Sequence, residues 1–204
     1  MTTMIVRAGA ALLVPALFLL SACAQLPPPT HAHLLLPAKQ RAQVLASVQR
    51  WTATGQASLR GPRGSQSFGF VWQQQPHGER LSILGPLGNT VAELHEDGRQ
   101  AMLLEANGKK LTASNMSILL DRVLGVELPV QELPGWLLGI PPPGQVSGYD
   151  AAGLPERAHW GVWQLQYLRY EAVGGLRMPA LLQATGPNGL RLRIAVGNWQ
   201  LGQP

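Results

Sequence analysis

Residues 51–60 read WTATGQASLR, and apolar or small residues fall at every second position of this stretch. Trp51, Ala53, Ala57 and Leu59 share one side, whereas the residues between them are mostly Thr, Gln and Ser. This period-two alternation is the pattern of a β-strand that buries one face and exposes the other. The stretch therefore predicts a half-buried strand at the start of a sheet.

The alternation recurs along most of the chain that follows. It continues to about residue 113 and is interrupted by short turns rich in Gly, Pro, Asn and Asp. Asn107-Gly108 and Asn188-Gly189 are strong signals for tight turns between antiparallel strands, because both residue types tolerate positive φ. We predict about nine to eleven strands in one curved antiparallel sheet.

The C-terminal part of this sheet begins again after the middle of the chain. We expect one strand over His159–Tyr170, one that carries Leu176 and Met178, one over Pro179–Thr185 and a last one over residues 190–196. Arg191 and Arg193 alternate with apolar residues in the last strand, which places them on its exposed side.

Two segments between these groups of strands have the spacing of helices. Apolar residues of the first follow an amphipathic helical stripe at Met116, Leu119, Leu120, Val123 and Leu124. Ser114 or Asn115 can cap its start, and Gly125 can end it. The second apolar set is Val130, Leu133, Leu137 and Ile140, with Trp136 beside it. Pro134-Gly135 weakens this second helix, and the run Pro141–Gly144 ends it.

A long antiparallel sheet with one apolar face must bury that face. Two short helices cannot fill the concavity of so many strands, so we expect an α+β, mainly β fold. It would be an unclosed antiparallel β-barrel covered by short lid helices, with an apolar cavity between them. From the pattern alone, a sandwich with a filled core is the alternative.

The N-terminal residues have the pattern of an export signal. Arg7 is the only charge before a short apolar stretch, Ala8–Ala22, which is too short to span a bilayer easily. Leu20-Ser21-Ala22-Cys23 resembles the bacterial lipobox, in which the cysteine is lipidated and becomes the first residue after cleavage. We therefore expect a signal peptide over 1–22, a lipidated Cys23 with a proline-rich tether over 23–40, and a domain over 41–204.

The composition excludes several other classes of protein. With a single cysteine and five scattered histidines, the chain has no disulfide framework and no metal-site spacing. The net charge of +5 comes from dispersed basic residues, which gives little reason to expect nucleic-acid binding. No nucleophile–base pair and no phosphate-binding loop is found, so we expect neither an enzyme nor a cofactor.

Several segments resemble the LolB family of outer-membrane lipoproteins in their order and spacing. From the N-terminal side they are Trp72–Gln75, Gly85–Gly88, Val130–Pro141, Met178-Pro179, Leu190–Ile194 and Asn198-Trp199. Pro134-Gly135 departs from the family, whose helix here is usually better formed, and this puts the rigidity of the lid in doubt.

The resemblance implies a monomeric acceptor of lipoproteins, anchored by lipid, palmitate included, on the periplasmic side of the outer membrane. Such a protein takes triacylated lipoproteins from the periplasmic carrier LolA, which shares the fold, and inserts them into the inner leaflet of that membrane. Arg191 and Arg193 are candidates for a basic surface that meets the carrier. A structural or assembly lipoprotein that binds a protein partner and a tethered hydrolase are the alternatives.

The resemblance also implies roles for individual residues. The leucine of the Gly-Pro-Leu-Gly motif protrudes in the family, so Leu87, with Pro86 and Gly88, is expected to form a membrane-insertion loop. The acyl-chain cavity is expected to be lined from the sheet by Phe68, Phe70, Trp72, Leu81, Ile83 and Leu103. The expected lid residues are Leu119, Val123, Trp136, Leu137 and Ile140. Each of these apolar residues can equally be ordinary core.

Overall fold

A computed structural model describes residues 35–142 and 144–202 of the chain. The expected signal peptide and Cys23 lie outside the described residues. Residues 33–204 form one compact unit with its own hydrophobic core, so we expect this unit to fold without the residues that precede it. No helix among the described residues is long and apolar enough to cross a membrane.

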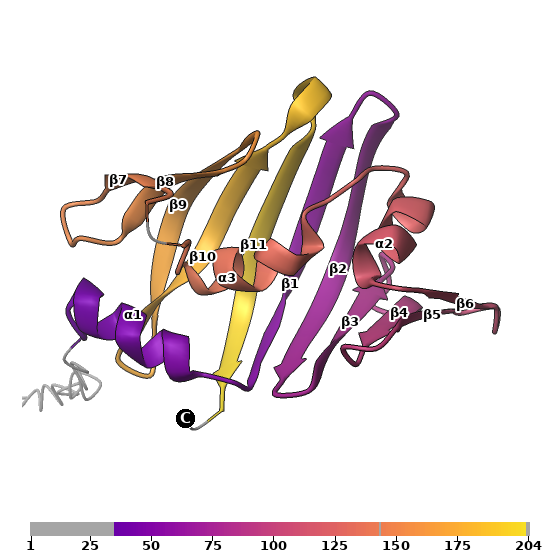
Figure 1. Ribbon diagram of the computed structural model, residues 1–204, viewed down its shortest axis with the longest axis horizontal. Coiled ribbons are helices and arrows are strands. Elements are labelled where there is room, and N and C mark those ends of the chain that lie inside the picture. The colour runs from indigo at the N-terminus through magenta and orange to yellow at the C-terminus, as the bar shows by residue number, and fades with distance from the viewer. Residues whose placement is uncertain (1–34, 143, 203–204) are drawn as a thin grey trace, which may run out of the picture. The chain divides into compact units, whose positions relative to one another are not determined.

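The unit is built on a single antiparallel sheet of eleven strands (Figure 1). In chain order the strands are β1 (Trp51–Gly61), β2 (Gly64–Gln75), β3 (Gly78–Leu84), β4 (Thr90–Glu96), β5 (Ala101–Glu105), β6 (Lys110–Ala113), β7 (Val146–Tyr149), β8 (Pro155–Trp160), β9 (Trp163–Val173), β10 (Leu176–Thr185) and β11 (Arg191–Leu201). In space they follow the order β6-β5-β4-β3-β2-β1-β11-β10-β9-β8-β7. The edge strands β6 and β7 do not pair in the described part of the chain, so the predicted unclosed antiparallel sheet is confirmed.

The α-helices cover one face of this sheet (Figure 1). They are α1 (Ala38–Ser47), α2 (Met116–Leu124) and α3 (Leu133–Leu138), and the short 3-10 turn η1 (Val130–Glu132) leads into α3. A further 3-10 turn, η2 (Pro187–Gly189), joins β10 to β11. We call residues 116–138 the lid, because α2, η1 and α3 pack over the apolar face of the sheet.

The two predicted helices are confirmed. The first has its predicted start and end, whereas α3 ends at Gly139, before the run of residues 141–144 that was expected to end it. Asn115 caps α2 through its side-chain oxygen, which accepts a hydrogen bond from the Ile118 amide at 3.1 Å. Gly125 ends α2 with a φ of 69°, a value that favours glycine. Pro134 lies in the first turn of α3, where the missing amide hydrogen costs nothing, and Gly139 ends that helix with a φ of 65°.

Two expectations about the C-terminal strands are wrong. The predicted strand His159–Tyr170 is a hairpin, because β8 and β9 meet at a two-residue turn, Gly161-Val162, in which Gly161 has a φ of 54°. The two strands predicted around Pro179 are one strand, β10. Its pairing with β9 is shifted between Pro179 and Leu181, where a bulge accommodates the residue that has no amide hydrogen.

The sequence pattern did not predict α1 or β7. Helix α1 begins at Ala38, inside the segment expected to be a tether, and its two buried side chains are Arg41 and Leu45. The Leu36 amide donates a hydrogen bond to the carbonyl of Gly175 at 3.0 Å, so the chain contacts the β9–β10 turn before α1 begins. A buried arginine interrupts the apolar stripe by which an amphipathic helix is recognised.

Candidate functional site

The interior between sheet and lid contains a pocket lined by twelve residues, all of them apolar. From the sheet these are Ala57, Phe68, Phe70, Trp72, Leu81, Leu192 and Ile194. From the lid they are Leu120, Leu124, Leu128, Leu133 and Leu137. The residues lie on the inward side of β1, β2, β3 and β11, because alternation along each strand directs every second side chain to this face.

The pocket is almost closed in this structure. Its free volume is about 40 Å³, whereas an ordinary ligand site measures about 300–1,000 Å³. The open cavity expected from the sequence is therefore not seen, because the leucines of the lid fill it. An acyl chain can enter this interior only if the lid moves away from the sheet.

One residue of the pocket lining is hydrogen-bonded to a partly buried carboxylate. Trp72 donates a hydrogen bond from Nε1 to Oε2 of Glu79 at 2.9 Å, which satisfies the one polar atom of the indole ring. Burial raises the pKa of Glu79 above its ordinary value of 4.5; the hydrogen bond from Trp72 opposes this shift, and the nearby Glu96 adds to it. The folded state therefore favours the protonated carboxyl group more than the unfolded state does.

We expect Glu79→Gln to raise the unfolding temperature at neutral pH. Because the folded-state pKa is raised, the contribution of Glu79 to stability is fully present below about pH 4 and is lost as the pH rises through the folded-state value. Glutamine still accepts the Trp72 hydrogen bond and carries no charge to desolvate. Thermal unfolding from acidic to neutral pH measures the effect, with the exposed Glu156→Gln as a control for net charge. A variant no more stable than the parent chain at neutral pH would contradict this account.

A second, open groove lies between α2 and the β4–β6 side of the sheet. It has a volume of about 760 Å³, within the range of ordinary ligand sites. Its lining residues are Ile83, Val91, Ala92, Glu105, Ala106, Asn107, Lys109, Leu111, Arg122 and Val123. Ile83 is two residues from Leu81 on the same face of β3, so the groove and the interior pocket are neighbours along one strand.

The turn between β3 and β4 joins two strands that line this groove. Gly88 donates its amide hydrogen to the carbonyl of Gly85 at 2.9 Å, and Gly85 donates to the carbonyl of Asn89 at 2.8 Å. Gly88 has a φ of 78°, a value that favours glycine. The tight turn leaves the Leu87 side chain 94% exposed, more than any other large apolar side chain in the described residues.

Each lid helix ends on a glycine whose carbonyl accepts a hydrogen bond from an arginine. At the end of α2, Arg63 donates from Nη1 to the Gly125 carbonyl at 2.5 Å, on the surface. At the end of α3, Arg41 donates from Nη1 to the Gly139 carbonyl at 3.1 Å and from Nη2 to the Leu138 carbonyl at 2.6 Å. Carbonyls at a helix C-terminus lack partners within the helix and attract cations.

Arg41 is the one buried charged side chain among the described residues, with 1% of its surface exposed. Its Nε donates to the carbonyl of Arg177 on β10, and its guanidinium lies 5.6 Å from the ring centre of Tyr170. Burial lowers the pKa of Arg41 from its ordinary 12.5, yet a guanidinium remains charged at physiological pH. A single side chain of α1 thus joins α1, the end of the lid and the sheet.

The structure separates the residues expected to line one cavity into three groups. Phe68, Phe70, Trp72, Leu81 and Leu137 line the interior pocket, whereas Ile83 and Val123 line the open groove. Leu103, Leu119 and Trp136 are buried in the core and line neither, and Ile140 is partly buried against that core.

Seven residues of the interior pocket are additional to the expected set. They are Ala57, Leu120, Leu124, Leu128, Leu133, Leu192 and Ile194. Most of them carry the same periodic signal as the expected residues, so the sequence could have supplied them as candidates. The periodicity does not show which inward residues border a pocket, because that depends on the packing of the lid.

Comparison with known proteins relates the chain to one family. The sequence profile described as "Outer membrane lipoprotein LolB" matches residues 49–199. The chain is 31% identical over 186 residues to an outer-membrane lipoprotein LolB of Azoarcus sp., covering 91% of each. It is 28% identical over 173 residues to that of Tolumonas auensis, covering 81% of this chain and 84% of the relative.

A solved structure of similar fold is that of a LolA superfamily protein from Nitrosomonas europaea. The TM-score is 0.51 at 9% identity, and the match covers 83% of this chain and 95% of the other. At this identity the likeness concerns the fold alone.

Proposed function

Because this chain belongs to the LolB family of outer-membrane lipoproteins, we propose that it accepts lipoproteins from a periplasmic carrier of the LolA type and delivers them to the outer membrane. The family acts in the localisation of lipoproteins at the outer membrane, which involves no bond-making chemistry.

The observation that carries the proposal is the composition of the interior pocket, in which all twelve lining residues are apolar. Each methylene group removed from water contributes about 0.8 kcal/mol, so three exposed acyl chains would cost on the order of tens of kcal/mol. A protein that moves such chains between two other partners must cover them throughout. An apolar interior beneath a movable cover meets this requirement.

The open groove is the natural entrance to this interior. It is already large enough for part of an acyl chain, and its floor continues along β3 toward the closed pocket. Movement of the lid would join the two spaces. Exchange between carrier and acceptor then requires no ATP, provided that the acceptor binds the cargo at least as well as the carrier does.

Anchoring and delivery are assigned to residues outside this interior. We assign residues 1–22 to a signal peptide, Cys23 to lipidation and residues up to about 40 to the connection with the domain. The exposed Leu87, with Pro86 and Gly88, is assigned to contact with the inner leaflet of the outer membrane. A lipid anchor would keep this turn within reach of that leaflet.

One observation favours a second candidate, an assembly lipoprotein that binds a protein partner. The free volume of about 40 Å³ is what a protein with an ordinary filled core would show. The two candidates differ in whether the interior opens to apolar ligands.

We expect the domain of residues 33–204 to bind a fluorescent fatty acid and to take lipoprotein from a loaded carrier. Because the ligand binds only the folded chain, it should add about 2.7 kcal/mol to the free energy of unfolding when its concentration is 100 times Kd. Fluorescence titration, thermal unfolding and separation of the two proteins after mixing measure these effects. A domain that binds no fatty acid and takes no cargo would support the assembly candidate instead.

A further inference from the structure

The outer face of the sheet, opposite the lid, carries exposed basic residues, and those at its centre have no acidic partner within 4 Å in the described part of the chain. Two adjacent rows of side chains cross β8, β9, β10, β11, β1 and β2 on this face. In that strand order, the first row is His159, Gln164, Thr185, Arg191, Arg60 and Ser65. The second row is Arg157, Gln166, Gln183, Arg193, Ser58 and Ser67. Neither row contains a carboxylate.

The outward direction of these rows follows from the residues between them. Leu192 and Ile194 line the interior pocket, so Arg191 and Arg193 point to the other face of β11. Leu59 is likewise buried beside the exposed Arg60. We call Arg60, Arg191 and Arg193 the arginine patch.

The three arginines of the patch lie close together although their like charges repel one another. Arg60 and Arg191 are direct partners in the pairing of β1 with β11, and Arg193 is two residues further along the same face. Like charges directly opposite each other on a sheet are destabilising. No ion pair within 4 Å joins any of the three to an acidic residue in the described part of the chain.

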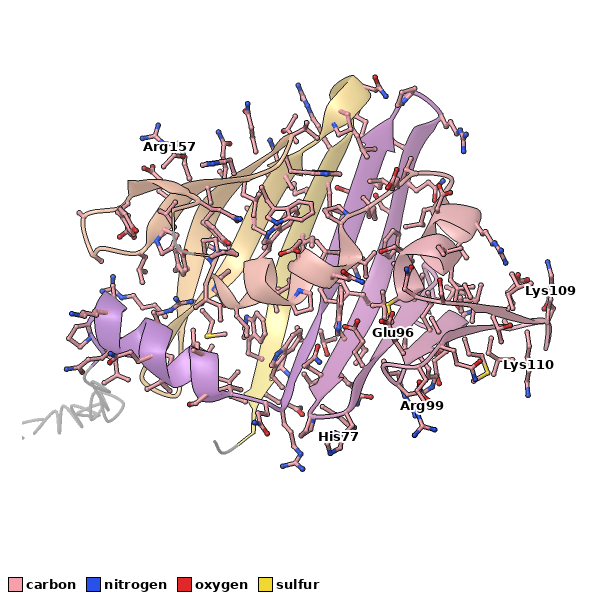
Figure 2. All side chains as sticks on the ribbon, in the orientation of Figure 1. His77, Glu96, Arg99, Lys109, Lys110 and Arg157 are labelled. Atoms are coloured by element: carbon pink, nitrogen blue, oxygen red, sulfur yellow. The ribbon has the colours of Figure 1, made fainter. Side chains whose placement is uncertain are left out.

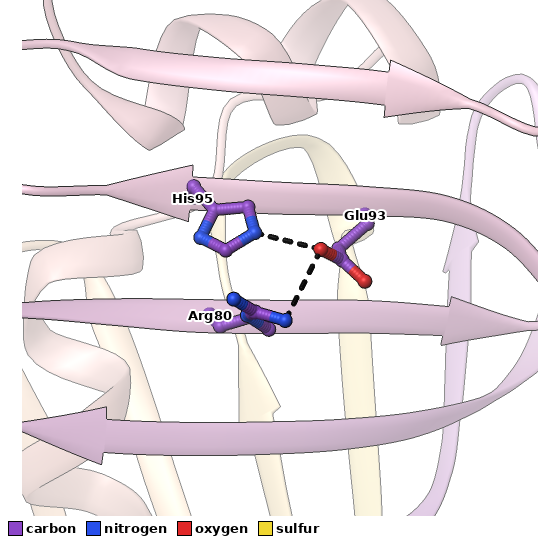
Figure 3. Close-up of polar contacts among 3 residues, drawn as sticks. All are labelled: Arg80, Glu93 and His95. Atoms are coloured by element: carbon purple, nitrogen blue, oxygen red, sulfur yellow. Dashed lines mark hydrogen bonds and ion pairs between the residues drawn. The ribbon is translucent and has the colours of Figure 1, made fainter. Parts of the chain in front are cut away.

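Other outer-face arginines do have acidic partners. Nη1 of Arg80 lies 3.5 Å from Oε1 of Glu93, and Nε2 of His95 lies 2.6 Å from the same oxygen. Figure 3 shows these three side chains together. Arg169 lies 3.2 Å from Glu171, and Arg157, labelled in Figure 2, lies 4.0 Å from Glu156. These arginines each have an acidic partner on the outer face, whereas the three of the arginine patch have none among the described residues. We infer that the counter-ion of the patch comes from another molecule.

The position of the arginine patch indicates what that molecule is. Arg60 precedes the β1–β2 turn and Arg191 begins β11, so both lie at the end of the sheet that also carries the β3–β4 and β8–β9 turns. Those two turns expose the most accessible large apolar side chains of the described residues, Leu87 at 94% and Val162 at 72%. Exposed apolar tips at the same end of a domain as a group of arginines are typical of contact with an anionic membrane.

We propose that the arginine patch binds the phosphate groups of anionic phospholipids and orients the domain with Leu87 toward the bilayer. None of the row residues lines the interior pocket or the open groove, and their strands leave them on the exposed face of the sheet, which suits contact with an extended surface. The planar guanidinium binds phosphate oxygens through two parallel hydrogen bonds. This inference rests on the proposed function, because the proposed function places the chain at a membrane surface.

The test is the binding of the domain of residues 33–204 to vesicles, in three forms. The first is the unsubstituted domain, and the second carries Arg60→Gln, Arg191→Gln and Arg193→Gln. The third is a charge-matched control with three exposed basic residues of other regions replaced, Lys39→Gln, Arg50→Gln and Arg99→Gln. Vesicles of phosphatidylethanolamine with phosphatidylglycerol are compared, by co-sedimentation, with vesicles in which phosphatidylcholine replaces phosphatidylglycerol.

We expect the unsubstituted domain to prefer the anionic vesicles and to lose this preference as salt is added. The patch variant should bind them roughly a hundredfold more weakly, and the control variant should bind them nearly as well as the unsubstituted domain does. Removing the repulsion between Arg60 and Arg191 should leave the unfolding temperature equal or higher, which shows that the variant is folded.

Two outcomes would overturn the inference. Equal losses in the patch and control variants would show that only net charge matters. Normal vesicle binding by the patch variant, with impaired transfer from the carrier, would assign the patch to an acidic protein surface. Uptake of fatty acid without vesicles tests the proposed function separately, and the patch variant should retain it.

Discussion

Replacing Arg41 with methionine is expected to lower the free energy of unfolding by about 3–5 kcal/mol. The substitution keeps most of the aliphatic stem but removes every donor of the guanidinium. The carbonyls of Leu138 and Gly139, at the end of α3, then lose the side-chain donor that they have in the native chain. The backbone carbonyl of Arg177 loses the same donor. Urea unfolding measures the loss as a lower midpoint with an unchanged slope.

Arg63 provides a matched control, because it makes the corresponding contact at the end of α2. It donates to the Gly125 carbonyl at the surface, where water can replace it. Arg63→Met should therefore cost less than about 1 kcal/mol. Equal effects of the two substitutions, or a loss below 1 kcal/mol for Arg41→Met, would show that the buried position of Arg41 is unimportant.

The Arg41→Met variant also tests how firmly the lid is held to the rest of the domain. Without its donors, the end of α3 is held to α1 and β10 by apolar packing alone, so the lid should open more often. Amide hydrogen exchange should accelerate over residues 136–140 more than in the central strands β1 and β11. Arg41→Lys should not restore the native rate, because an ammonium group cannot reproduce the planar arrangement of three donors.

The sequence predicted those parts of the fold whose residues repeat with a regular period. The alternation beginning at Trp51 and the apolar stripe beginning at Met116 each reflect one buried face. The strands and the helix could therefore be predicted from these patterns. The hairpin at Gly161-Val162 was missed because a two-residue turn barely interrupts the alternation of the strands that it joins. Helix α1 was missed because its buried residues include Arg41, whose partners are carbonyl groups that any sequence provides.

The candidate site was predictable to a lesser extent. Leu87 could be singled out because a large apolar residue between Pro86 and Gly88 is unusual in a tight turn. The division of inward residues between pocket, groove and core depends on where the lid packs, and no periodic pattern encodes this. The pairing of Arg60 with Arg191 depends on the register of β1 against β11, and these two residues are 131 positions apart in the sequence.

Replacing Leu87 with glutamate is expected to leave the fold and the acceptance of cargo unchanged but to reduce delivery into liposomes at least tenfold. Burying a leucine side chain in an apolar medium contributes about 1.5–3 kcal/mol, which corresponds to about a 10- to 100-fold change in partition. A glutamate carboxylate must in addition lose its hydration to enter the same region. Stability should change by less than about 0.5 kcal/mol, because the native side chain is 94% exposed.

The measurement follows a lipoprotein through two separate steps. The domain is first loaded from a carrier without liposomes, and liposomes are then added and the cargo that floats with them is counted. Leu168→Glu is the matched control, because it makes the same change at an exposed leucine within β9 rather than in a turn. It should deliver cargo normally.

The arginine patch and Leu87 should affect different stages of this delivery. Arginines attract the domain to an anionic surface over a Debye length of about 8 Å, whereas a leucine contributes only after it has entered the bilayer. Leu87→Glu should therefore retain most of its salt-sensitive binding to anionic vesicles while releasing little cargo. The patch variant should recover delivery when its concentration is raised, because its substitutions weaken only the first association of the domain with the membrane. Normal delivery by Leu87→Glu would show that the exposed leucine has no part in transfer, whatever the patch does.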